Sequence, residues 1–207
     1  MVSQLSLDEF LEQLASKAST PGGGSAAGLM GAMGAALVSM VCNLTIGKPQ
    51  YAAVETDLQD LLVRAEALRA ALAGSIAEDV AAFDQVMAAY GLPKATDEEK
   101  AARTTAIQAA LREAMAVPMR AAHLAAQVVD LSAEAADKGN INVVSDAGVA
   151  VVAALAALKS AALNVYVNAS ALKDRTHAEA QVAELDALLA NSEARAAGIY
   201  ARVRSRL

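Results

Sequence analysis

The sequence is poor in aromatic and basic side chains. Only 3% of its 207 residues are Phe, Tyr or Trp, and Trp does not occur. Lys and Arg together number 17 against 23 acidic residues, which gives a formal net charge of -6. A nucleic-acid-binding protein needs a basic surface to neutralise phosphates. The charge balance therefore predicts that nucleic acid is not a partner.

Cysteine and histidine are also scarce, which restricts disulfide and metal chemistry. The single cysteine, Cys42, excludes an internal disulfide and favours a reducing compartment. His123 and His177 are far apart and belong to no ligand cluster of the HExxH type. Acidic residues such as Asp8 stand where a signal peptide needs a basic start. We predict a cytoplasmic protein without a metal site.

The hydrophobic content, in contrast, is high at 56%, and most of it is Ala, Leu and Val. Ala and Leu are strong helix formers, and no convincing strand pattern occurs. Ser6 with Glu9 and Thr96 with Glu99 have the form of capping boxes. The predicted helices run from residue 6 to before residue 19, and then over about 25–46, 50–89, 96–136, 145–172 and 176–204. The sequence predicts an all-α fold, a single-domain bundle of about six helices, several of them long, over residues 1–207.

Two of these helices carry almost no charge. Residues 26–46 could just span a bilayer by length, but they are rich in Gly, Ala, Ser and Met, and charged amphipathic helices occur elsewhere. We therefore predict buried helices of a soluble protein and no membrane association. One bundle of this size can surround one such helix, but two are harder to bury. The pair predicts a homodimer that shares them.

Two groups of polar residues stand where an apolar core would not need them. Gly22, Gly23 and Gly24 precede Ser25 at the start of an uncharged helix, where backbone N–H groups can approach a ligand. A flexible turn with Ser25 as N-cap explains the same residues. Asp79 lies four residues before Phe83, and both share a helix face with Ile76, which is the apolar core side, so burial would raise the pKa of Asp79 unless a partner compensates. A satisfied buried aspartate is the alternative.

Two further groups lie in the second half of the chain. Asn140, Ser145 and Asp146 stand at a helix entrance, where simple capping is the alternative to ligand binding. Asn164 and Asn168 form a polar stripe with Ser160 on an otherwise apolar helix. Buried amides need partners, so the stripe either ties helices together or binds a heteroaromatic ligand.

These motifs, in their order and spacing, resemble the formiminotransferase-cyclodeaminase/cyclohydrolase family over about residues 6–200. The segments that carry the resemblance are 21–25, 33–37, 39–41, Asp79 with Ala82–Phe83, 92–94, 98–100, Gly139–Asn140, Ser145–Asp146 and Asn164 with Asn168. The resemblance implies an all-α homodimer with a tetrahydrofolate derivative bound between the subunits as substrate, and no further cofactor. It also implies that Asp79 is the catalytic residue.

The resemblance assigns substrate binding to residues of each group. These are Gly22, Gly23, Gly24, Ser25, Lys48, Phe83, Lys94, Asn140, Ser145, Asp146, Asn164 and Asn168, with the lysines toward the glutamate tail. Residues 43–48 and 145–150 look like the bacterial methenyltetrahydrofolate cyclohydrolase branch, which hydrolyses 5,10-methenyl- to 10-formyl-tetrahydrofolate. Deamination of 5-formimino-tetrahydrofolate, which releases ammonia, is one alternative. A non-catalytic helical dimeric interaction protein is another.

Overall fold

The computed structural model describes residues 5–207, and within them all regular secondary structure is helical, with no strand. Its elements are α1 (Leu7–Leu14), α2 (Gly23–Asn43), the 3₁₀ helix η2 (Pro49–Val54), α3 (Glu55–Tyr90), α4 (Asp97–Lys138), the 3₁₀ helix η3 (Ile141–Val143), α5 (Val144–Ala171) and α6 (Arg175–Arg204). The predicted all-α class with six helices is confirmed for this part of the chain. The predicted domain also includes residues 1–4, which lie outside the described residues, and its single-domain character stays a prediction.

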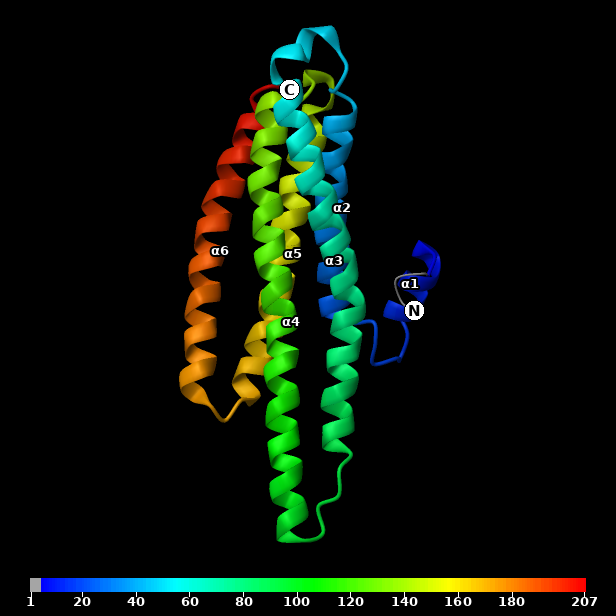
Figure 1. The fold of residues 1–207 in the computed structure, drawn as a ribbon, viewed down its shortest axis with the longest axis vertical. Coiled ribbons are helices and arrows are strands. Elements are labelled where there is room, and N and C mark those ends of the chain that lie inside the picture. The colour runs from blue at the N-terminus through cyan, green and yellow to red at the C-terminus, as the bar shows by residue number, and fades with distance from the viewer. Residues whose placement is uncertain (1–4) are drawn as a thin grey trace.

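Helices α2 to α5 run alternately up and down and pack side by side (Figure 1). These four helices form a ring in the order α2, α3, α4, α5, with α2 also touching α4 across it, and α6 covers α4 and α5 from outside. Short connections between consecutive helices favour this antiparallel arrangement. The helix α1 stands beside the bundle (Figure 1). At one end α3 and α4 extend beyond the start of α2, which leaves the first turn of α2 against the middle of α3.

The helix ends largely follow the capping signals. Both predicted capping boxes are present, since Ser6 and Thr96 each accept from the backbone of Glu9 and Glu99 respectively. Two boundaries differ from expectation. Residues 49–54 form a 3₁₀ helix before α3, with Pro49 in its first turn. The expected glycine turn is also shorter, because α2 begins at Gly23 and its first turn contains the glycines.

Small residues bring α2 close to its neighbours. A Cβ added to Gly28 would lie 2.7 Å from Ser75 Oγ of α3, and one added to Gly34 would lie 3.0 Å from the carbonyl oxygen of Ala150 of α5. Side chains at these positions would push the helices apart, as expected where small residues line a helix contact. The glycines therefore set the position of α2 between α3 and α5.

Pro118 lies inside α4 and interrupts its hydrogen bonding. Proline has no N–H, so the carbonyl of Ala114, four residues earlier, loses its partner within the helix. The amide of Asn168 in α5 replaces that partner, with Nδ2 donating to the Ala114 oxygen at 2.7 Å. This contact agrees with the interpretation of the amide stripe as a tie between helices.

Two segments, Gly23–Asn43 and Ile141–Ala171, are long and apolar enough to cross a membrane by length and composition. Core helices of soluble proteins meet the same criteria. Within the chain 61% of the most apolar stretch of the first segment is buried, but only 44% of that of the second. The remaining apolar surface on α5 therefore needs another explanation.

Candidate functional site

Asp79 of α3 lies half-buried against the first turn of α2. The hydroxyl of Ser25, which is fully buried, donates to Asp79 Oδ2 at 2.9 Å. The N-cap residue of α2 is Gly22, which has no side chain to accept from the free N–H groups of the first turn. The carboxylate from α3 thus stands at a helix N-terminus, where partial positive charge favours an anion.

Gly24 provides the space that this arrangement requires. A Cβ on Gly24 would lie 2.0 Å from Asp79 Oδ1 and 2.5 Å from its Cγ, so any side chain would displace the carboxyl group. Gly23 is different, because its nearest neighbour would be Asn164 Nδ2 at 3.7 Å, an ordinary contact. The approach of Asp79 accounts for Gly24, while ligand binding at Gly22 and Gly23 stays a prediction.

Burial raises the pKa of Asp79 above its usual value of 3.8, and hydrogen bonds from the hydroxyl and backbone of Ser25 oppose the rise. The acidic neighbour in sequence, Glu78, is paired with Arg120 of α4 at 3.1 Å. A carboxyl group with a raised pKa exchanges protons closer to neutral pH, which suits general acid–base chemistry.

The two asparagines of the stripe lie on the other side of the α2 start. Asn164 donates through Nδ2 to the Ser160 carbonyl at 2.9 Å and lies next to Gly23. Asn168 donates to the carbonyls of Ala114 and Asn164, the second at 3.0 Å. Because these bonds use both N–H groups of Asn168, its side-chain oxygen is the group that remains for a ligand. The structure thus brings Gly22–Ser25, Asp79 and Asn164 together, with Asn168 one turn beyond.

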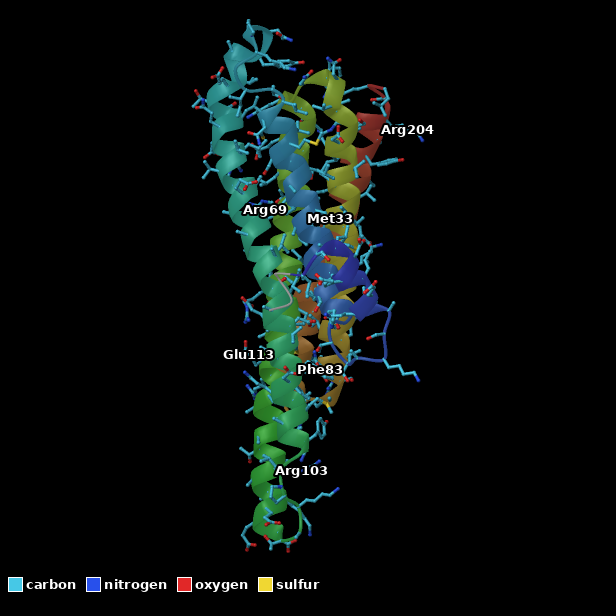
Figure 2. The ribbon with its side chains drawn as sticks, turned by 90° about the vertical axis from the view of Figure 1, so that its right-hand side faces the viewer. Met33, Arg69, Phe83, Arg103, Glu113 and Arg204 are labelled. Atoms are coloured by element: carbon cyan, nitrogen blue, oxygen red, sulfur yellow. The ribbon has the colours of Figure 1, made fainter. Side chains whose placement is uncertain are left out.

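Phe83 departs from the expected burial. It was expected on the core side with Ile76, but Phe83 is 36% exposed while Ile76 is 7% exposed. The reason is that α2 begins level with Asp79, so the next turn of α3 has no helix in front of it. Figure 2 shows Phe83 near the start of α2. Its ring is accessible beside the Asp79 carboxylate.

A second set of candidate residues lies at the far end of the bundle. Lys48, Ser145 and Asp146 lie near the end of α2 and the start of α5, and the 21 residues of α2 put them about 30 Å from Ser25. Ser145 lines an apolar pocket of about 290 Å³ between α5 and the end of α6. Lys94 is exposed in the connection between α3 and α4, away from both groups. One chain does not bring these residues to Asp79.

Asn140, also at this far end, is 3% exposed and its polar groups are engaged within the chain. Its backbone N–H donates to Thr45 Oγ1 at 2.9 Å and its Nδ2 donates to the Leu44 carbonyl at 3.1 Å. Its Oδ1 accepts from the backbone of Asn142 at 3.1 Å. These bonds connect the end of α2 to the start of η3, and substrate binding by Asn140 stays a prediction.

Metal and thiol chemistry find little support in the described residues. Among residues 5–207 no three His, Cys, Asp or Glu side chains form a group that could hold a metal ion. Cys42 is buried, and burial raises the pKa of its thiol to about 11. A thiol with such a pKa stays protonated and is a poor nucleophile.

Sequence reasoning missed two contacts of this region. Ser25 and Asp79 are 54 positions apart, so no local spacing could pair them. The contact of Asn168 with Ala114 could have been predicted, because a proline inside a helix leaves the carbonyl four residues earlier without a partner. That carbonyl needs a hydrogen-bond donor from another helix, and the asparagines of the stripe are candidates for this donor.

Comparisons with known proteins identify the family of the chain. A family model described as formiminotransferase-cyclodeaminase matches residues 6–187. A methenyltetrahydrofolate cyclohydrolase of Methylorubrum extorquens is 56% identical over 207 residues, all of both chains. The rat formimidoyltransferase-cyclodeaminase is 33% identical over 97% of this chain, which spans 37% of the rat protein. The crystal structure of formiminotetrahydrofolate cyclodeaminase from Thermotoga maritima superposes with a TM-score of 0.82 at 32% identity, covering 100% of this chain and 98% of that one. A match over nearly the whole described fold, with the Asp79 region inside it, means that the chain belongs to the formiminotransferase-cyclodeaminase family.

Proposed function

We propose that the protein is a methenyltetrahydrofolate cyclohydrolase, which hydrolyses 5,10-methenyltetrahydrofolate to 10-formyltetrahydrofolate. The observation that carries this proposal is the half-buried carboxyl group of Asp79, held by Ser25, in a chain that aligns end to end with a relative of that name. The reaction needs a base for water and an acid for a leaving nitrogen, and a carboxyl group with a raised pKa can serve as both.

The methenyl bridge is an amidinium-like cation that joins N5 and N10. The carboxylate of Asp79 stabilises this charge and accepts a proton from a water molecule as its oxygen bonds to the bridge carbon. Asp79 then donates that proton to N5 as the bond between carbon and N5 breaks. The remaining hydroxyl proton leaves to solvent, which gives the neutral formyl group on N10 and balances the positive charge of the substrate.

Residues around Asp79 supply contacts for the pterin ring next to the methenyl bridge. Phe83 offers an exposed ring beside the carboxylate, and Asn168 offers a side-chain oxygen that can accept from a heteroaromatic N–H group. Asn164, which lies next to Gly23, would contact the same ligand. Lysine side chains such as Lys48 and Lys94 would bind the carboxylates of the glutamate tail. No cofactor takes part in this scheme.

We infer that the protein acts as a homodimer through one face of α2 and α5. On α5 this face carries Val149, Val152, Leu163 and Val167, which are 51–67% exposed. Met33 and Met40 continue it on α2, and Figure 2 shows Met33 on the outer side of that helix. Large exposed apolar patches mark interaction surfaces, and a second copy offers the same apolar surface in return.

The dimer also accounts for the candidate residues at the far end. In a symmetric antiparallel pair the start of α5 in one subunit lies beside the end of α5 in the other. Such a pair would bring Ser145 and Asp146 of the partner subunit near Asn164. A twofold axis that crosses the middle of α5 thus unites the two sets of residues, which are about 30 Å apart in one chain.

The cyclodeaminase reaction is the second candidate. It is favoured by the Thermotoga maritima structure, which is named a formiminotetrahydrofolate cyclodeaminase and covers the whole of this chain. Both reactions act on the same N5–C–N10 centre, so the Asp79 geometry supports either. A non-catalytic interaction protein would share the apolar face but would have no need of the Asp79 arrangement. For the enzyme we propose a cytoplasmic location without nucleic-acid or membrane partners, which agrees with the negative net charge and with the partial burial of both apolar helices.

Absorbance of the methenyltetrahydrofolate chromophore tests the function directly. With the purified protein its decay should accelerate and 10-formyltetrahydrofolate should accumulate, while 5-formimino-tetrahydrofolate should give little ammonia. The Asp79→Asn variant removes the base and the charge, so its turnover number should fall about 10²–10⁴-fold. Rapid ammonia release would favour the cyclodeaminase instead. An unchanged decay of both folates would leave the interaction protein, and near-normal turnover by folded Asp79→Asn would end the role of Asp79.

A further inference from the structure

We propose that Ser25 is a positioning residue for Asp79, and that it fixes the catalytic carboxylate instead of binding substrate. The inference rests on the proposed function, since it concerns the same carboxyl group. It assigns Ser25 a different role from the one that the family resemblance suggests. It also explains why a serine follows two glycines in the first turn of α2.

Ser25 is fully buried against Asp79. Its relative exposure is 0%, and its hydroxyl donates to Asp79 Oδ2 at 2.9 Å. A side chain without exposed surface and with its one O–H donor already used has no donor left for a ligand. The backbone of Ser25 also acts to lower the pKa of this carboxyl group. Ser25 therefore contacts the substrate only through Asp79.

The second carboxylate oxygen of Asp79 lies against Gly24. Asp79 Oδ1 lies over Gly24, within 2.0 Å of the place where a Cβ would be. Oδ1 therefore packs directly against the backbone of Gly24, where only a glycine leaves room for it. The Ser25 hydroxyl at Oδ2 and the Gly24 backbone at Oδ1 together fix the orientation of the carboxyl group. Fixing a catalytic group before the reaction lowers the entropy cost of reaching the productive geometry.

The neighbours of Asp79 on each packed element leave Ser25 as its main polar partner. On α2 these are Gly24 and Ser25, and neither is charged. On α3 the adjacent Glu78 pairs with Arg120 of α4, which also contacts Glu113. On α5 the neutral amide of Asn164 lies beside Gly23 at the start of α2. Loss of the Ser25 hydroxyl should therefore change the titration of Asp79 directly.

The test compares Ser25→Ala with Ser39→Ala. Ser39 is a matched control, because it is also buried on α2 and donates to a carboxylate of α3, Glu66, at 2.7 Å. We expect Ser25→Ala to lower the turnover number at least about tenfold with little change in the Michaelis constant. The acidic limb of its pH–rate profile and the ¹³C-NMR titration of the Asp79 carboxyl should both move up by about one pH unit. Ser39→Ala should change neither.

Each other result has a defined meaning. A raised Michaelis constant in Ser25→Ala, with turnover and the Asp79 titration unchanged, would overturn the proposal and return Ser25 to substrate binding. If Ser25→Ala does not fold, Ser25→Cys keeps the volume with a weaker donor and should move the titration in the same direction. If the wild-type protein turns over neither folate, the proposed function fails, but the NMR titration still decides whether Ser25 positions Asp79.

Discussion

At the scale of single residues, Asp79 is subject to two opposing effects. Burial raises its pKa and so disfavours the charged form, while the hydroxyl and backbone of Ser25 favour it. The net direction is upward, so burial is the larger effect. Residues with such shifts often lie at functional sites, where they lower stability in exchange for reactivity.

The raised pKa predicts how Asp79 affects stability. Between pH 3.8 and its pKa in the folded protein, the folded state binds more protons at Asp79 than the unfolded state does. The free energy of unfolding therefore falls as the pH rises through this window, and the loss persists at neutral pH. Asp79→Asn cannot ionise, so it should be more stable than the wild type at pH 7.

Urea unfolding of both proteins at pH 7 and below pH 3.8 measures this difference. The gain of Asp79→Asn should disappear at the lower pH, where the wild-type carboxyl is neutral as well. Subtracting the wild-type value at each pH cancels the titration of all other groups. A variant that is less stable than the wild type at pH 7 would show that the hydrogen bonds of the carboxylate outweigh its burial.

Gly24 gives a second prediction at this scale. Gly24→Ala should displace the Asp79 carboxyl group, because the new Cβ would lie 2.0 Å from Oδ1. Turnover should fall about as far as in Asp79→Asn, roughly 10²–10⁴-fold. Gly74→Ala on α3 is the control, since its Cβ would meet nothing within 4 Å and alanine favours the helix by about 0.5–1 kcal/mol. Steady-state kinetics of both variants, with circular dichroism to check folding, measures this difference. A folded Gly24→Ala with full activity would contradict the prediction.

At the scale of helices, α5 supplies a hydrogen bond that α4 lacks. Pro118 deprives the Ala114 carbonyl of its helical partner, and Asn168 supplies the missing donor at 2.7 Å. A buried carbonyl without a partner costs about 1–3 kcal/mol, so this amide is important for stability whatever it contributes to binding. The same bond orients Asn168 toward its neighbour Asn164.

A double-mutant cycle measures the energetic coupling between Asn168 and Pro118. Asn168→Leu should lower the free energy of unfolding by about 1–3 kcal/mol in the wild-type background, because it leaves the Ala114 carbonyl unpaired. Pro118→Ala restores an N–H to α4, so the same leucine substitution should cost clearly less in that background. Chemical denaturation of the four proteins gives the coupling energy. Equal costs in both backgrounds would mean that Asn168 does not act through Ala114.

At the scale of the whole molecule, the proposed homodimer depends on the apolar face of α2 and α5. Val152, near the middle of this face, is 51% exposed in one chain. Val152→Glu would place a charge in the proposed dimer interface and should shift the protein to monomers at micromolar concentration. Its activity should fall as well, since the partner subunit would no longer complete the site.

Sedimentation velocity of Val152→Glu beside Val63→Glu provides the measurement. Val63 on α3 is 70% exposed and lies outside the α2 and α5 face, so glutamate there should leave the dimer intact. A wild-type protein that sediments as a monomer would remove the proposed interface altogether. A dimer that survives Val152→Glu would place the interface elsewhere.

The sequence by itself determined the helices and most of their ends. Alanine and leucine content, the capping boxes at Ser6 and Thr96, and the Gly91–Pro93 break act over a few residues, so local patterns predict them. Asp79 and Asn164 were also identified as polar residues that an apolar core does not need. Motif order suggested the family, and the comparisons confirmed it.

Only the tertiary structure decided what these residues do for one another. Ser25 and Asp79 are 54 positions apart, and their contact depends on how closely α2 approaches α3 at Gly24 and Gly28. The exposure of Phe83 likewise depends on where α2 begins relative to α3. Such distances result from the packing of whole helices, which local propensity and spacing along one helix do not specify.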